Sequence, residues 1–180
     1  MNFIKTEIPE VIILEPKVFG DERGYFFESY NKKDFDLNIG TVDFIQDNES
    51  KSKKGVLRGL HFQKPPYSQA KLVRCVQGSV LDVVVDLRSG SSTFGKHISV
   101  ELSGSNKKQL YIPKGFAHGF IVLSEEAVFA YKVDSPYMPE FESGIKWDDE
   151  DLNIDWIINK IDIQLSSRDK VFSTLKELKF

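Results

Sequence analysis

Residues 72–87 read LVRCVQGSVLDVVVDL. Two short apolar runs, Leu72–Gln77 and Ser79–Leu87, lie on either side of Gly78. Runs of this length that are rich in valine are typical of β-strands, and a glycine between them tolerates the positive φ of a tight turn. The stretch therefore predicts two strands joined by a hairpin turn at Gln77-Gly78.

The same pattern continues in both directions along the chain. Further strands are expected at Val11–Glu15, Gly24–Tyr30, Thr41–Asn48, Val56–Gln63, Lys96–Leu102, Gln109–Pro113, Ala117–Leu123 and Val128–Val133, with a second hairpin turn at Leu102-Ser103-Gly104-Ser105-Asn106. The basic run Ser50–Lys54 is expected to be a solvated loop. Many short, evenly spaced strands favour a barrel or a jelly roll.

Helical patterning is expected only near the end of the chain. An acidic loop, Asp148–Asp151, follows Trp147, and Ser166-Ser167-Arg168-Asp169 then precedes apolar residues at helical spacing, namely Val171, Phe172, Leu175 and Leu178. We expect one mainly all-β domain over residues 1–180, with a short C-terminal helical segment lying on the barrel.

The charge balance excludes several partners. Lys and Arg number 24 and Asp and Glu 27, a net charge of −3, so nothing draws the whole molecule to nucleic acid or to an anionic membrane. No apolar run approaches the ~20 residues that span a bilayer, and the N-terminus does not resemble a signal peptide. Cys75 is the only cysteine, which rules out an internal disulfide and suits a buried apolar position. A cytoplasmic protein is expected.

One motif identifies the kind of jelly roll. Pro113 to His118 reads PKGFAH, and its P-x-G-x-x-H spacing resembles the second motif of the cupins. Gly55 and His61 resemble the start of their first motif, but Gln63 stands where a second metal-binding histidine is expected. Since the chain has only three histidines, it lacks the convergent imidazoles of a cupin metal site. A cupin-type double-stranded β-helix without metal or other cofactor is predicted.

Six stretches in register resemble one family within this fold. They are Asp21–Glu28, Gln46–Asn48, Val56–Gln63, Lys71–Arg74, Ile112–Phe120 and Tyr131-Lys132. Together they resemble the dTDP-4-dehydrorhamnose 3,5-epimerase family from about Phe3 to Lys170. The resemblance implies an epimerase that inverts C3 and C5 of dTDP-4-dehydro-6-deoxy-D-glucose through an enolate. This reaction belongs to dTDP-rhamnose biosynthesis, which supplies lipopolysaccharide.

The resemblance implies four catalytic residues. His61 is the candidate base, since imidazole titrates near neutral pH. Asp169 resembles the carboxylate that orients this histidine, although Ser166 to Asp169 also fits a helix-capping pattern. Tyr131 is the implied acid on the opposite face, and Lys71 the implied cation beside the enolate oxygen. Core packing for Tyr131 and solvent exposure for Lys71 are the alternatives.

The remaining implied residues bind substrate. Guanidinium groups pair bidentately with phosphate, so the candidates for binding the diphosphate of the substrate are Arg23, Arg58 and Arg168. The resemblance adds contacts from Gln46, Asn48, His118, Tyr137 and Glu142. It also implies a homodimer with strand exchange, in which Phe26 and Glu28 reach the pocket of the neighbouring subunit. Three aromatic residues in a row, Tyr25 to Phe27, are more aromatic surface than a free strand edge should expose, which independently favours a covered edge.

Arg58 and His61 raise a question of geometry. An odd separation of three residues places side chains on opposite faces of a regular strand. A β-bulge at Gly59 would bring both to one pocket.

Other functions remain open at this stage. An epimerase of one carbon only, or of a related nucleotide sugar, would use the same groups. A metal cupin such as a dioxygenase and an inert sugar-binding cupin belong to different classes.

Overall fold

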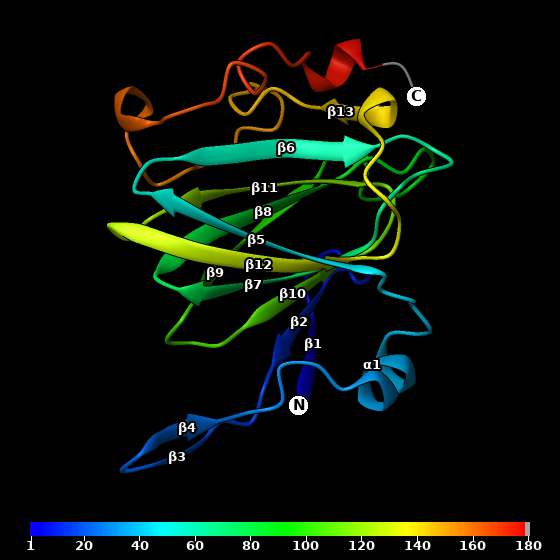
Figure 1. Cartoon of the computed structure of the whole chain (residues 1–180). Helices are drawn as coiled ribbons and strands as arrows, with labels where there is room; N and C mark the ends of the chain where they lie inside the picture. The colour runs from blue at the N-terminus through cyan, green and yellow to red at the C-terminus, as the bar shows by residue number, and fades with distance from the viewer. Residues whose placement is uncertain (179–180) are drawn as a thin grey trace.

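Two antiparallel β-sheets face each other in the computed structural model, which describes residues 1–178 (Figure 1). The first sheet has the order β1-β2-β10-β7-β12-β5, formed by Asn2–Lys5, Ile12–Glu15, Gln109–Ile112, Lys71–Gln77, Glu126–Val133 and Gln46–Lys53. The second has the order β13-β6-β11-β8-β9, formed by Glu142–Gly144, Leu57–Gln63, Phe116–Val122, Ser79–Asp86 and His97–Ser103. The cupin-type jelly roll predicted from the sequence is confirmed.

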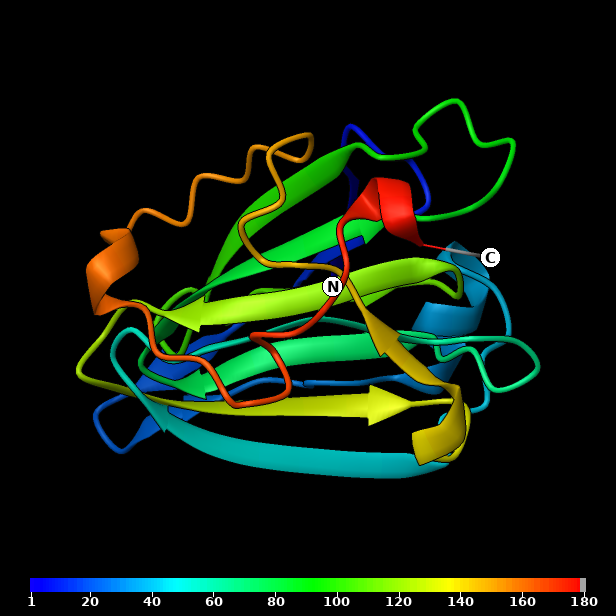
Figure 2. The same ribbon diagram turned by 90° about the horizontal axis from the view of Figure 1, so that it is seen from above.

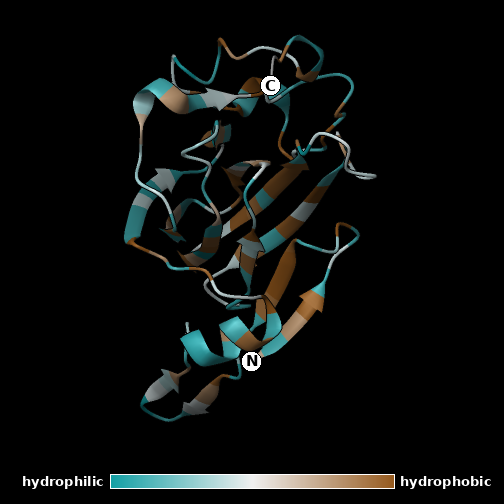
Figure 3. Ribbon diagram, turned by 90° about the vertical axis from the view of Figure 1, so that its right-hand side faces the viewer, coloured by the Kyte–Doolittle hydropathy of each residue, from teal (hydrophilic) through white to brown (hydrophobic). Residues whose placement is uncertain are grey.

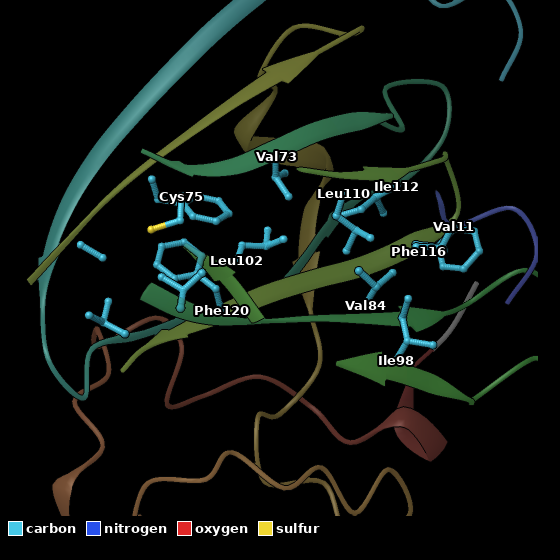
Figure 4. Packing of buried hydrophobic residues seen from close by; sticks show 14 of the residues in the cluster. Val11, Val73, Cys75, Val84, Ile98, Leu102, Leu110, Ile112, Phe116 and Phe120 are labelled. Carbon is cyan, nitrogen blue, oxygen red and sulfur yellow. The ribbon is translucent and has the colours of Figure 1, made fainter. Parts of the chain in front are cut away.

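The space between the sheets is filled by alternate side chains of their strands. Val73 and Cys75 of β7 point towards Phe120 of β11 and Leu102 of β9 (Figure 4). Burial raises the pKa of the Cys75 thiol to about 11, so this cysteine is an unreactive apolar residue, as predicted. This packing supplies the rigid walls from which the polar side chains of the site project.

The second sheet is also covered on its outer face. The C-terminal segment crosses β6, β11 and β8 (Figure 2), and Trp156 packs there with Val83 and Ile121. Strand β8 is thus buried on both faces, which explains why residues 79–87 show no strict alternation. The outer face of the first sheet is covered at one end by Phe35 of helix α1, Lys32–Asn38.

Both predicted hairpins are wrong in their pairing. The chain does turn at Gly78, which has φ of +76°, but β7 belongs to the first sheet and β8 to the second. The turn at 102–106 likewise leads from β9 in the second sheet to β10 in the first. A glycine turn reverses the chain without deciding whether the flanking strands share a sheet, and β8 pairs instead with β11 and β9.

Some predicted element boundaries also need correction. The strand expected at Gly24–Tyr30 is limited to β4, Gly24–Phe26, which pairs with β3, Phe19–Asp21. The strand expected at Thr41–Asn48 begins at Gln46 and continues to Lys53, through the predicted loop at Ser50–Lys54. Ser52 is buried there while its lysine neighbours are exposed, so the run is an alternating strand.

The expected C-terminal helix is reduced to single turns. Among residues 1–178, the C-terminal segment has only 3-10 turns at Lys160–Asp162 and Leu175–Glu177, besides a third at Pro139–Phe141 further upstream. Val171 is 78% exposed, so the apolar spacing does not form a continuous helix face. Helix α1 was not predicted from the sequence. Phe35 is its single buried residue, so the helix has no repeating apolar face that a sequence pattern could show.

The predicted domain includes residues 179–180, which lie outside the described part, and its extent stays a prediction. None of the helices in residues 1–178 has the length and hydropathy of a membrane span.

Candidate active site

A cavity of about 440 Å³ opens between the two sheets and beneath the C-terminal segment. It brings together most of the residues proposed from the sequence, namely Gln46, Asn48, Arg58, His61, Lys71, His118, Tyr131, Tyr137, Glu142, Arg168 and Asp169. The first sheet contributes Gln46, Asn48, Lys71 and Tyr131, whereas the second contributes Arg58, His61, His118 and Glu142. Polar groups therefore face this cavity from opposite walls.

Strand β6 carries the bulge that the spacing of Arg58 and His61 required. His118 of β11 pairs with His61, but Phe120 pairs with Arg58. The two pairs are three residues apart on β6 and two residues apart on β11, so β6 contains one extra residue. Gly59 adopts φ of +137°, and a Cβ atom there would lie 2.5 Å from Cα of Gly119. Glycine at this position allows the close approach that turns both polar side chains into the cavity.

His61 is paired with Asp169, which lies 108 residues away in the sequence. His61 Nε2 is 2.5 Å from Asp169 Oδ1, and the Asp169 side chain is only 4% exposed. Burial raises the pKa of Asp169, but its hydrogen bond and ionic interaction with His61 outweigh that effect and lower it. An ionised Asp169 accepts a hydrogen bond from Nε2–H, which leaves Nδ1 as the basic nitrogen of the ring.

The capping alternative for residues 166–169 is also present, without a helix. The amide of Asp169 donates to Ser166 Oγ at 3.1 Å, which closes a turn. The backbone of Asp169 takes part in this turn while its carboxylate contacts His61, so the two contacts are present together.

Lys71 and Tyr131 face this pair from the first sheet. Desolvation lowers the pKa of Lys71 to about 8, while the charges of Asp82 and Glu142 partly counter it. Burial raises the pKa of Tyr131, so its phenol stays protonated near neutral pH. Lys71 is half-buried and lines the cavity, so it is not a freely exposed strand-end lysine, and Tyr131 lies at the boundary of core and cavity.

His118 forms a second buried pair on the floor of the cavity. Its Nε2 is 2.8 Å from Asp82 Oδ2, and the two side chains are 8% and 0% exposed. Burial lowers the pKa of His118 in spite of the opposing effect of Asp82, and its ring stacks on Phe129 at 6.1 Å. The imidazole is thus held in one orientation.

Tyr137, Glu142 and Arg168 meet at the mouth of the cavity. The Tyr137 hydroxyl donates to Glu142 Oε2 at 2.7 Å, and Arg168 forms an ion pair with the same carboxylate. Half-exposed Tyr137 and exposed Arg168 leave this cluster open to solvent.

Three residues proposed from the sequence lie away from the cavity. Arg23 and Phe26 belong to the exposed β3–β4 ribbon, where Arg23 is paired with Asp21. Glu28 follows the ribbon and accepts from Asn31 at 3.3 Å. Within one chain these residues do not take part in the site.

The cavity also has lining residues that the sequence analysis did not assign to substrate binding, namely Ser50, Phe62, Gln63, Gln69, Phe120, Phe129 and Ser166. Strand alternation could have found Ser50, Gln63, Phe120 and Phe129, because each lies two residues from a proposed residue of its own strand. The positions of Phe62, Gln69 and Ser166 depend on strand pairing and loop packing.

The residues present do not fit the metal of a cupin. Gln63, at the second-histidine position, donates to backbone oxygens of Tyr67 and Pro136 and accepts from the amide of Met138. His61 and His118 are each held by a carboxylate. Within residues 1–178, no three His, Cys, Asp or Glu side chains are grouped so that they could hold a metal ion.

A jelly roll that holds a His–Asp pair, a lysine and a tyrosine between its sheets defines a class, the cupin-fold enzymes of proton transfer. The sequence profile of the dTDP-4-dehydrorhamnose 3,5-epimerase family matches residues 5–177. The Shigella flexneri protein of that name is 62% identical over 157 residues, which are 87% of each chain.

Solved structures agree. The Elizabethkingia anophelis NUHP1 enzyme of the same name has a TM-score of 0.96 and 52% identity, covering 100% of this chain and 99% of its own. The Legionella pneumophila Philadelphia 1 dTDP-6-deoxy-D-glucose-3,5-epimerase, in complex with dTDP-4-keto-L-rhamnose, has a TM-score of 0.95 and 50% identity, covering 99% and 94%. The chain belongs to the dTDP-4-dehydrorhamnose 3,5-epimerase family and is an epimerase.

Proposed function

We propose that the protein converts dTDP-4-dehydro-6-deoxy-D-glucose to dTDP-4-dehydro-L-rhamnose by inverting C3 and then C5 of the sugar. The observation that carries this proposal is the placement of His61 and Tyr131 on opposite walls of one cavity. Inversion of a carbon beside a ketone needs a base on one face and an acid on the other. The ligand of the Legionella relative is the product expected here.

In the proposed mechanism, His61 Nδ1 removes the proton from C3, and the electron pair of the broken C–H bond forms the enolate at C4. The Asp169 carboxylate stabilises the resulting imidazolium. The Lys71 ammonium stabilises the negative charge on the C4 oxygen. Tyr131 then donates its proton to the opposite face of C3. His61 releases its proton to solvent and Tyr131 regains one from solvent, which restores both groups, and the same cycle is repeated at C5 after the ring turns.

The proposed nucleotide site lies at the mouth of the cavity. Arg58 and Arg168 supply cations for the diphosphate, and Gln46, Asn48, Tyr137 and Glu142 surround the rest of the nucleotide. His118 contacts the sugar from its fixed position on the floor.

We also propose that the active form is a homodimer in which the β3–β4 ribbon crosses to the second subunit. The ribbon extends away from the sheets (Figures 1 and 3), and Phe19, Tyr25 and Phe26 are 54%, 60% and 67% exposed. Burial of this aromatic surface is strongly favourable, and crossing would bring Arg23, Phe26 and Glu28 to the partner's cavity. A cytoplasmic location, supported by the single unpaired Cys75, is part of the proposal.

The proposal is tested by incubating the enzyme with the keto sugar nucleotide in D₂O and following C3 and C5 by NMR. Deuterium at both carbons, with inverted configuration, is the expected result. Incorporation at C3 alone would identify an epimerase of one carbon, and no incorporation would identify a binding protein.

A further inference from the structure

We infer that Gln63 is a positioning residue that fixes the Tyr137 ring at the mouth of the cavity, and thereby sets affinity for the nucleotide. The inference rests on the proposed function, because it takes the nucleotide to bind at this end of the cavity. The inference assigns a role to Gln63, which stands where a metal cupin has its second histidine ligand.

The Gln63 side chain holds the backbone on both sides of Tyr137. Its Nε2 donates to the Pro136 carbonyl at 3.0 Å, and its Oε1 accepts from the Met138 amide at 2.7 Å. The second hydrogen of Nε2 bonds the Tyr67 carbonyl at 2.7 Å, on the facing loop. With both donors and the acceptor engaged, this buried amide has one orientation only.

The hydroxyl of Tyr137 is held by Glu142, the residue that faces Gln63 on the neighbouring strand. This hydroxyl donates to Glu142 at 2.7 Å, and Glu142 of β13 pairs in register with Gln63 of β6. Backbone and hydroxyl of Tyr137 are therefore both fixed by one pair of facing residues, although its side chain lies at the surface, 49% exposed.

The loop of Tyr137 is tied down elsewhere as well. Gln69 donates to the Ser135 carbonyl at 2.8 Å, and Tyr67 packs on Phe141 with ring centres 4.6 Å apart. Because these contacts remain when Gln63 is changed, its substitution is expected to release Tyr137 without unfolding the loop.

Calorimetric titration with dTDP tests the inference. Gln63→Glu keeps an acceptor for Met138 but loses both donors, and we expect its dissociation constant to rise about tenfold. The KM of the sugar nucleotide should rise in parallel, with kcat within threefold of the wild type. Gln164→Glu is the matched control, since this exposed glutamine also donates to a backbone carbonyl, that of Lys54, away from the site.

A double-mutant cycle separates positioning from a general structural effect. In a Tyr137→Ala background, Gln63→Glu should change the dissociation constant less than twofold, because the ring on which Gln63 acts is gone. If Gln63→Glu does not fold, Gln63→Met replaces it in the same cycle, since it has similar volume and forms none of the three hydrogen bonds.

Equal tenfold losses in both backgrounds, unchanged affinity in the wild-type background, or a loss of kcat with normal affinity would each overturn the inference. A wild-type chain that fails to bind dTDP would contradict the proposed function, and the inference would fall with it.

Discussion

His61 and Tyr131 lie on opposite sheets, so their substitutions should have different effects at the level of single proton transfers. We expect His61→Asn to abolish hydrogen exchange at C3 and C5 alike, with turnover reduced by about 10²–10⁴-fold and dTDP binding retained. Tyr131→Phe should still lose substrate hydrogen to solvent while forming little product, since only proton return fails. NMR in D₂O measures both steps, and equal loss of abstraction and product in Tyr131→Phe would contradict the assignment.

Lys71 should set the alkaline side of the pH profile. Its pKa of about 8 means that the ammonium beside the enolate is lost as pH rises through that value, so kcat/KM should fall above about pH 8. Lys71→Ala should reduce turnover by about 10²-fold or more and remove this dependence. Lys71→Arg stays charged, so its remaining activity should persist to higher pH. An unshifted alkaline limb in both variants would rule out this role.

Gln63 occupies its hydrogen bonds with backbone groups, and the two cavity histidines are held by carboxylates. Since no three His, Cys, Asp or Glu side chains of residues 1–178 are grouped to hold a metal ion, EDTA should leave the turnover rate unchanged. Stoichiometric zinc, iron or manganese, together with recovery of EDTA-treated enzyme by that metal, would show the opposite.

At the scale of the element, the bulge in β6 is what places Arg58 and His61 on one side. A Cβ atom on Gly59 would meet Gly119 at 2.5 Å in a backbone conformation that disfavours side chains. Such strain and overpacking each cost about 1–3 kcal/mol, so Gly59→Ala should destabilise the fold by several kcal/mol. Gly40→Ala is the control, because Gly40 has a similar φ of +116° and open space around it.

Urea unfolding compares the two glycine variants. A much larger loss for Gly59→Ala than for Gly40→Ala is expected, with a matching loss of epimerase activity. Equal losses would mean that the conformation of Gly59, and not its contact with Gly119, dominates.

At the scale of the whole molecule, the β3–β4 ribbon gives the clearest expectation. Its exposed aromatic residues need cover, so light scattering at micromolar concentration should give the mass of a dimer. Phe26→Ser combined with Tyr25→Ser should shift the population towards monomer and reduce activity. Leu37→Ser is the control, since Leu37 is 82% exposed on α1 and outside the ribbon. A wild-type monomer at this concentration would contradict the proposal.

The sequence alone determined the β-rich class and the cupin motif around His118, whereas most residues of the cavity were implied by the resemblance to the family. These signals are local: alternation, turn glycines and motif spacing are set by neighbouring residues along the chain. The bulge at Gly59 was predictable for the same reason, because strand parity makes an odd spacing of Arg58 and His61 detectable.

Only the tertiary structure decided which strands pair, and therefore which residues line each wall of the cavity. A turn at Gly78 looks the same in a hairpin and in a crossing between sheets, because turn conformation depends on the turn residues and pairing depends on distant strands. His61 and Gln63 of strand β6 contact residues far away in the chain: Asp169 for His61, and Pro136 and Met138 for Gln63. The first contact was expected only from the resemblance to the family. No local pattern records such contacts, because packing of the complete fold creates them.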